Sequence, residues 1–203
     1  MGSPRLNPLA KLIGIVIVAI GVSLIYQYRN TGPRFIPTVG QPERGSSFEY
    51  FSPTDNLEHA DIDQLSRASK TVDVAMYAFT DRFLADHLVK LAKRGVVIRI
   101  YRDRSQFEEE QRRAAQSQNG SVMDIFRGQG NIHVRVKGTT DLMHLKAYLV
   151  DGTLLRDGSA NWSPSGLKRQ DNNAHFTTDP EQVKRFRDFF DGMWTRSDND
   201  EIQ

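Results

Sequence analysis

Along residues 71–101 the spacing of apolar residues changes from that of a strand to that of a helix and back again. This pattern restricts the fold more than any other feature of the sequence. In Thr71–Phe79 the residues alternate as they do in a strand. Thr80–Asp81 can cap a helix, which is predicted to end at Gly95, and Val96–Tyr101 is again apolar. A strand, a helix and a strand with short connections form a right-handed parallel crossover. The sequence therefore predicts an α/β fold.

The chain from Ser46 onward continues this pattern, and we expect one domain over residues 46–203. A short turn is expected around 122–126, and the last helix carries an apolar stripe that ends at Trp194. Other strands are predicted at 46–51, 131–136, 144–150 and 171–177, and other helices at 54–69, 106–118 and from Asp179 onward. We predict a mixed, mostly parallel sheet with helices on both faces.

The segment 144–161 carries the polar residues that indicate chemistry. His144 and Lys146 are two positions apart before an apolar run, so in a strand both side chains lie on one face. Asp151 begins a turn, after which the chain returns towards Ser159 and Asn161. An imidazole, a fixed cation and two neutral donors suit displacement at a phosphate diester, because negative charge gathers on its non-bridging oxygens.

The spacing H-x-K-x4-D-x6-G-S-x-N closely resembles the HKD motif of the phospholipase D superfamily. With a single copy in a short chain, it is similar to the bacterial EDTA-resistant endonucleases of that superfamily. The resemblance extends from about Ser46 to the C-terminus. It implies a phospholipase D-like fold and a phosphodiesterase that needs no metal ion or other cofactor.

The resemblance also implies a role for each residue of the motif. One His144 would attack phosphorus to form a phosphohistidine, and a second His144 would protonate the leaving oxygen and then activate water. Lys146, Ser159 and Asn161 would bind the non-bridging oxygens. Asp151 is a further candidate, although its position after the strand favours capping of the turn or pairing with the lysine.

The chemistry of the family needs two histidines, and His144 is the one histidine with a lysine two positions later. No internal repeat is present. We therefore predict a homodimer with one composite active site on its two-fold axis. The two imidazoles would titrate as a coupled pair and produce a bell-shaped pH profile.

One residue of the family pattern is absent. The family has a glutamate, followed by an asparagine, that orients the nucleophilic histidine, whereas this chain has Asp171-Asn172-Asn173. Either Asp171 takes this role from a shifted register, or Asn172 takes it without a charge. An amide would hold the ring but would stabilise imidazolium less than a carboxylate does.

Leu9–Tyr28 carries Lys11 as its only charge, and this mostly apolar stretch is long enough for a helix across a hydrocarbon core of ~30 Å. We predict that residues 1–29 form an uncleaved membrane anchor. The alternative is a signal peptide, but no small-x-small cleavage site follows Ile25. Residues 30–45, which are rich in proline and glycine, would be a linker.

A short tail before such an anchor usually stays in the cytoplasm. The expected location is the inner membrane, with a single pass and a periplasmic catalytic domain; cleavage would instead release the domain into the periplasm or the medium. The absence of cysteine excludes disulfides and thiolate zinc sites and fits an oxidising compartment.

Three functions remain open. The first is a non-specific endonuclease for DNA or RNA, although the net charge of +2 requires a local basic patch. The second is a phospholipase D-type hydrolase of membrane lipids, and the third is a non-catalytic, membrane-tethered protein that binds nucleic acid. Trp162 could stack on bases, but we expect it to pack in a wall of the site. The candidate cations for a groove are Arg102, Arg104, Arg127, Arg135, Lys137, Lys168 and Arg169.

Overall fold

The computed structural model describes residues 43–202. The predicted anchor at residues 1–29 and most of the predicted linker at 30–45 lie outside this range. Within residues 43–202, no helix has the length and apolar character needed to cross a membrane.

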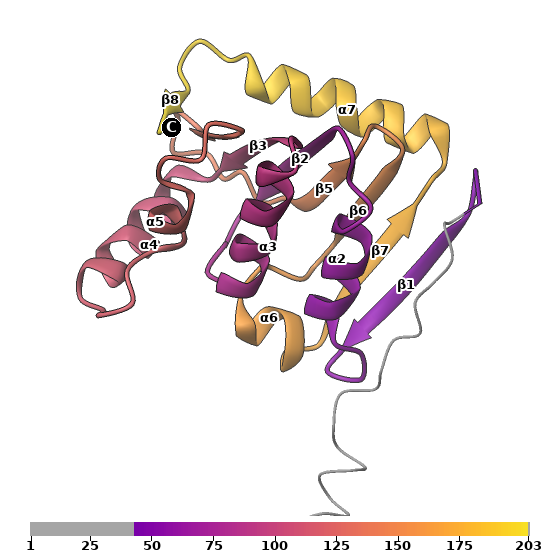
Figure 1. Cartoon of the computed structure of the whole chain (residues 1–203), viewed down its shortest axis with the longest axis horizontal. Coiled ribbons are helices and arrows are strands. Elements are labelled where there is room, and N and C mark those ends of the chain that lie inside the picture. Colours follow the sequence, from indigo (N-terminus) through magenta and orange to yellow (C-terminus); the bar gives the residue numbers. More distant parts are fainter. Residues whose placement is uncertain (1–42, 203) are drawn as a thin grey trace, which may run out of the picture. The chain divides into compact units, whose positions relative to one another are not determined.

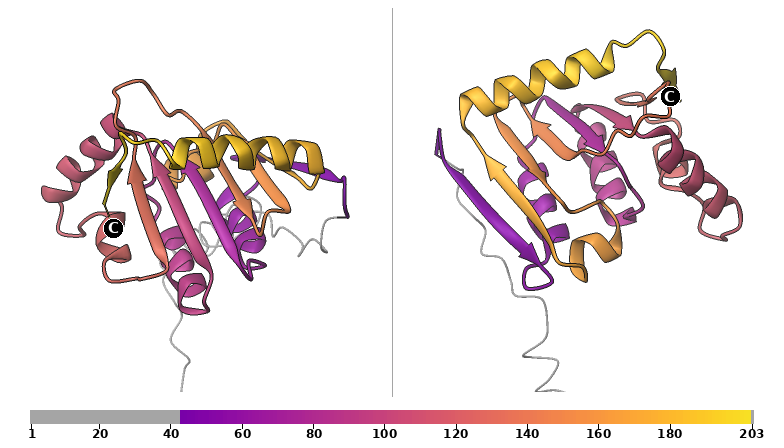
Figure 2. Two further views of the ribbon diagram at one scale, coloured as in Figure 1. Left: turned by 90° about the horizontal axis from the view of Figure 1, so that it is seen from above. Right: turned by 180° about the vertical axis from the view of Figure 1, so that it is seen from behind.

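Eight strands form one sheet in the order β1-β7-β6-β5-β2-β3-β4-β8 (Figures 1 and 2). The predicted strand positions are confirmed, apart from shifts of a few residues at their ends and a short C-terminal strand that was not expected. The strands are β1 Ser47–Ser52, β2 Thr71–Met76, β3 Val97–Arg102, β4 Ile132–Val136, β5 Lys146–Val150, β6 Leu154–Gly158, β7 Asn172–Thr177 and β8 Asp200–Glu201.

The sheet is mixed, but the prediction that it is mostly parallel is wrong. β2, β3 and β4 pair in parallel, as the crossover pattern predicts. The other five pairings, which include the central β2–β5 pairing, are antiparallel. The short connection between β5 and β6 allows only an antiparallel pair. β1 pairs with β7, which lies far away in the sequence, so no local pattern indicates its direction.

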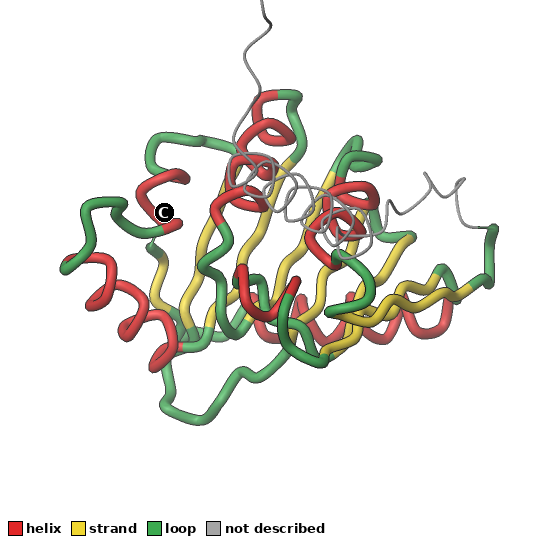
Figure 3. The backbone as a smooth tube through the Cα atoms, turned by 90° about the horizontal axis from the view of Figure 1, so that it is seen from below, coloured by secondary structure: helices red, strands yellow, loops and turns green. Residues whose placement is uncertain are grey.

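Helices cover both faces of the sheet, as predicted, and Figure 3 shows them on either side of the row of strands. The larger core lies beneath α2, α3, α5 and α6, and α7 packs on the opposite face through Phe190 and Met193. The helices are α2 Leu57–Leu65, α3 Arg82–Lys93, α4 Arg104–Ala115, α5 Val122–Phe126, α6 Pro164–Lys168 and α7 Pro180–Trp194.

Side-chain caps determine where the helices begin. Asp81 accepts a hydrogen bond from the Leu84 amide at 3.0 Å, so the predicted cap of α3 is confirmed. α2 begins later than predicted because Asn56, rather than Thr54 or Asp55, caps it. α4 begins at Arg104, earlier than the predicted start at Gln106, because the Asp103 side chain caps it by accepting from the Gln106 amide.

Candidate active site

His144 and Lys146 meet beside the aromatic ring of Tyr77, which directly follows β2. The imidazole of His144 is exposed and lies edge-on to the Tyr77 ring, with centroids 4.6 Å apart. The Lys146 ammonium lies 5.0 Å from the same ring centroid. β5 begins at Lys146, so His144 precedes the strand rather than belonging to it, contrary to the prediction. The two side chains nevertheless share one side because Tyr77 contacts both.

Backbone contacts hold the segment before β5 against β2 and α4. The Tyr77 amide donates to the Leu145 carbonyl at 2.9 Å, and Met76 pairs with Lys146 in the sheet. Asp103, the cap of α4, also accepts from the Met143 amide at 2.9 Å. One carboxylate therefore positions both a helix and the residue preceding His144.

Lys146 is arranged to hold an anion. Its residue is only 6% exposed, and its ammonium donates to the His144 carbonyl at 2.8 Å. Within residues 43–202, no carboxylate lies within ion-pair distance of it, and burial lowers the pKa of Lys146 below that of an ordinary lysine. A cation without an acidic partner can bind the charged oxygens of a phosphate.

Asn161 is held at the same end of β2 as this pair. Its Oδ1 accepts from the amide of Ala78, the residue after Tyr77, at 3.2 Å. Gly158, which ends β6, has φ +141°, and a Cβ there would lie 2.5 Å from the Asn173 carbonyl oxygen. The glycine of the motif is therefore required for the chain to leave β6 and reach Ser159 and Asn161.

Ser159 is tied to the segment that lacks the family glutamate. Its hydroxyl donates to Asn172 Oδ1 at 2.9 Å and accepts from the Asn173 amide at 3.0 Å. Asn172 also donates to the Gly166 carbonyl at 3.0 Å. Asp171 is exposed and makes no hydrogen bond or ion pair with the residues described, so the structure joins Asn172, and not Asp171, to the motif.

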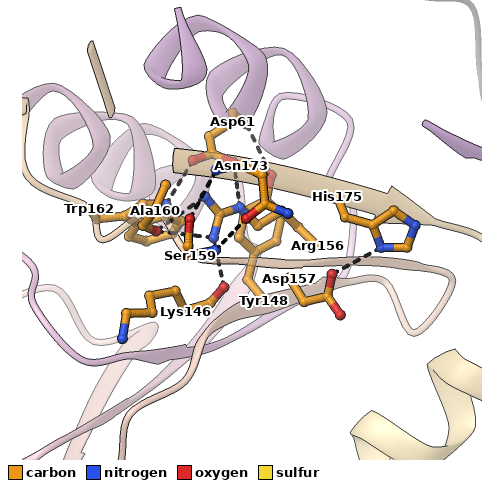
Figure 4. A network of polar contacts seen from close by, with 10 residues as sticks. All are labelled: Asp61, Lys146, Tyr148, Arg156, Asp157, Ser159, Ala160, Trp162, Asn173 and His175. Carbon is orange, nitrogen blue, oxygen red and sulfur yellow. Dashed lines mark hydrogen bonds and ion pairs between the residues drawn. The ribbon is translucent and has the colours of Figure 1, made fainter. Parts of the chain in front are cut away.

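A buried network behind the motif was missed by sequence reasoning (Figure 4). Arg156 is fully buried and donates to the Lys146 carbonyl at 2.7 Å and to the Ala160 carbonyl at 3.3 Å. Its guanidinium also lies 3.2 Å from Asp61, which accepts from Trp162 Nε1 at 2.9 Å. The network joins the backbone of β5 to the loop that carries Ser159 and Asn161.

The charged groups of this network are buried, and their burial affects the pKa of Asp61. Burial raises the pKa of Asp61, and the Arg156 charge opposes this rise. Two sequence signals could have revealed the pair of Arg156 and Asp61. Arg156 is a charged residue after two leucines in β6, and Asp61 is an acid between Ala60 and Ile62 in α2. Trp162 is fully buried, so its packing as a wall is confirmed.

Asp151 lies at the opposite end of β5 from Lys146. It forms the β5–β6 turn with Gly152, and both residues have positive φ. Its carboxylate accepts from the amides of Ser69, Lys70 and Thr71 at 2.8–2.9 Å and from the Ser69 hydroxyl at 2.7 Å. The structure therefore separates Asp151 from the other motif residues and assigns it to fixing the loop after α2.

Replacing Asp151 with asparagine is expected to reduce the free energy of unfolding by about 1–3 kcal/mol, because one acceptor oxygen becomes a donor facing Ser69. Burial would raise the pKa of Asp151, but its hydrogen bonds to Thr71, Ser69 and Lys70 together lower it. This stabilisation is present above the pKa of the unfolded chain and is lost as pH falls through the lowered pKa. Urea unfolding across pH checks this, with the exposed Asp86→Asn as control.

Most of the cations that could line a groove have acidic partners, which offset their positive charge. Arg102 is fully buried and lies 2.6 Å from Glu110. Lys168 lies 2.6 Å from Glu58. Arg104 pairs with Asp200, Arg127 with Asp124 and Arg135 with Glu201. Lys137 and Arg169 have no acidic partner in the part of the chain that is described.

A hollow of about 330 Å³ opens beside His144, between the segment before β5 and α7. Lys137 and Arg196 place positive charge on its lining. Leu142 and Phe189 also line it and are 61% and 54% exposed. The surface next to the imidazole is therefore both cationic and apolar.

Comparisons with known proteins agree with the motif. Residues 62–194 match the family model described as cardiolipin synthase, PLD-like domain. A mitochondrial cardiolipin hydrolase of Chlamydomonas reinhardtii is 33% identical over 133 residues, which cover 66% of this chain and 55% of the relative. The Drosophila melanogaster mitochondrial cardiolipin hydrolase is 32% identical, covering 66% and 56%. The chain thus spans just over half the length of these relatives.

Solved structures share the fold. NucT from Helicobacter pylori superposes with a TM-score of 0.62 and 21% identity, covering 73% of this chain and 95% of the other. The phospholipase D family member Nuc from Salmonella typhimurium gives a TM-score of 0.64 and 19% identity, covering 79% and 99%. As the spacing of its motif predicts, the chain belongs to the phospholipase D-like family.

Proposed function

We propose that this protein is a phosphodiesterase that hydrolyses nucleic-acid phosphodiester bonds through a phosphohistidine. The observation that carries the proposal is the exposed His144 imidazole beside Lys146, whose ammonium has no carboxylate partner among the described residues. The imidazole is open to attack phosphorus, and the ammonium holds the charge that develops on the non-bridging oxygens.

The reaction requires a second imidazole, which supports a homodimer. In one chain, His144 makes no ring-nitrogen hydrogen bond with the described residues. The nearby His175 pairs with Asp157 at 3.0 Å and points away from Lys146 (Figure 4). We infer that a second copy supplies its own His144 across a two-fold axis.

The proposed steps balance as two displacements. His144 Nε2 of one protomer forms a bond to phosphorus as the bond to the leaving oxygen breaks, and the partner's His144 donates a proton to that oxygen. The partner's imidazole then accepts a proton from water, whose oxygen attacks phosphorus and breaks the P–N bond. Lys146 and the Asn161 amide hold the non-bridging oxygens in both steps.

Lys137 and Arg196, which line the hollow beside His144, support a polyanionic substrate. Incubating the full-length protein with plasmid in EDTA tests the activity. We expect nicking by the wild type and none by His144→Ala. Intact plasmid with wild-type protein from pH 5 to 8 would contradict the nuclease proposal.

A phospholipid diester is the second candidate, because Leu142 and Phe189 expose apolar surface beside the same imidazole. The relatives named mitochondrial cardiolipin hydrolase also favour it. Release of phosphatidic acid from cardiolipin vesicles, combined with intact plasmid, would select this substrate. Binding of DNA without turnover, unchanged by His144→Ala, would select a non-catalytic role.

The lowered pKa of Lys146 predicts a second loss of activity, on the alkaline side of the bell-shaped profile that the imidazole pair produces. The ammonium loses its proton below the 10.5 of an ordinary lysine, so the activity left beyond the imidazole limb is expected to fall further before that pH is reached. Lys146→Arg should reduce kcat, since a guanidinium fits the space of an ammonium poorly, but it should remove this second fall and leave the imidazole limb in place. Rates on a chromogenic phosphate diester across pH measure both effects. An identical second fall in the arginine variant would contradict the assignment.

A further inference from the structure

A second concave site lies at the end of the sheet opposite Lys146. It has a volume of about 630 Å³ and surrounds the β5–β6 turn and the beginning of α7. This volume is within the ~300–1,000 Å³ of typical ligand pockets. Asp151, at the far end of β5 from Lys146, is part of its lining, so the pocket is separate from the active site.

Three arginines from distant parts of the sequence line this pocket, namely Arg44, Arg67 and Arg187. Arg187 lies over the turn, since a Cβ on Gly152 would be 3.6 Å from its Nη1. Arg44 and Arg187 are exposed and make no ion pair within the described range. Arg67 is paired with Asp63 at 3.1 Å. The guanidinium groups therefore bring a local excess of positive charge.

The rest of the lining offsets this charge only in part and is not wholly polar. Asp151 is the acid in the lining, and its carboxylate, which accepts from the amides of residues 69–71 and from the Ser69 hydroxyl, offsets one of the guanidinium charges. Val150, Leu154 and Val183 are buried and form an apolar floor. Cations above an apolar floor suit a ligand that has both an anionic and an apolar part.

We propose that this pocket binds the phosphate of an anionic phospholipid headgroup. Guanidinium groups bind phosphate oxygens through two parallel hydrogen bonds. Their positive charge favours an anionic headgroup over a zwitterionic one, because the ammonium group of a zwitterionic headgroup offsets the charge of its phosphate. A hollow of this volume accommodates one headgroup, whereas a polymer would need a groove continuing across the surface.

The position of Arg44 in the sequence supports a lipid source. Leu9–Tyr28, the predicted anchor, ends 16 residues before Arg44. A chain of that length spans at most about 50–60 Å when fully extended, so a bilayer that held the anchor would be within that distance of Arg44. Lys146 lies at the other end of β5 from the pocket, so a headgroup bound there would not occupy the active site. This inference does not depend on the proposed activity.

Hydrogen exchange on the full chain in lipid nanodiscs tests the proposal. His144→Ala is used as the background so that lipid is not hydrolysed, and discs of phosphatidylcholine are compared with discs that also contain phosphatidylglycerol. The anionic discs are expected to slow exchange of residues 150–154 and 180–187 by at least about tenfold. Arg44→Gln/Arg187→Gln should remove this protection. Arg185→Gln is the matched control, an exposed arginine of α7 outside the pocket lining, and should keep it.

Other outcomes would overturn the lipid assignment. Equal protection in the double variant would show that the pocket is not the site. If inorganic phosphate protected the pocket residues of the chain in phosphatidylcholine discs, and phosphatidylglycerol added nothing further, the ligand would be free phosphate. Arginine-dependent protection by a single-stranded oligonucleotide, without an effect of lipid, would indicate nucleic acid. Failure of the chain to enter either disc would remove the lipid source. Arg187→Gln in the otherwise wild-type chain should retain hydrolysis, which keeps this test separate from that of the activity.

Discussion

Replacing His144 with alanine is expected to lower phosphodiester hydrolysis by at least about 10³-fold, because the change removes both the nucleophile and the general acid. The exposed ring makes its main described contact with Tyr77, so thermal unfolding should change little. His175→Ala is the matched control. His175 pairs with Asp157 and points away from Lys146, and its loss should leave kcat within about twofold.

Mixed dimers test the composite site more sharply than the single variant does. When His144→Ala and wild-type chains are refolded or expressed together, activity should fall as the square of the wild-type fraction, because each site needs two imidazoles. A linear fall would mean that each chain acts alone and would contradict the shared site. An affinity tag on the His144→Ala chains alone, followed by pull-down of untagged wild-type chains, verifies that the chains have exchanged.

Arg156→Met is expected to lower the free energy of unfolding by about 3–5 kcal/mol, since it leaves the Asp61 carboxylate buried without its cationic partner. Methionine keeps much of the volume but frees the carbonyls of Lys146 and Ala160 that Arg156 binds. Urea unfolding measures the loss. Arg99→Met is the control, because Arg99 also contacts two acids, Asp73 and Asp191, but its side chain is 28% exposed and lies under α7.

A double-mutant cycle separates the buried charge from the positioning of the active site. Asp61→Asn in the Arg156→Met chain should recover much of the stability, because no ionised group is then buried alone. It should not recover kcat at a temperature where the protein is folded, because the two carbonyls stay without their donor. Full recovery of kcat would mean that Arg156 contributes stability only.

Several features could be predicted from short segments because one local interaction decides each of them. The strand–helix–strand crossover follows from apolar periodicity and from Asp81, whose carboxylate caps the amide three residues later. The turn at Asp151–Gly152 follows from two residues that tolerate positive φ. The spacing of His144, Lys146, Ser159 and Asn161 identified the family for the same reason, since these residues lie in or directly beside one strand–turn–strand unit.

Only the tertiary structure decided which distant segments meet. Asp61 and Arg156 lie on a helix and a strand that are far apart in the chain, and in the local sequence each is only a charged residue next to apolar ones. Tyr77 resembles any residue at a strand end until it is seen against His144 and Lys146. β1 pairs with β7 rather than with a neighbour in sequence. Periodicity, capping and turn propensity act over a few residues, whereas these contacts depend on how whole elements pack, and that packing satisfies buried charges and strand edges across the entire sheet.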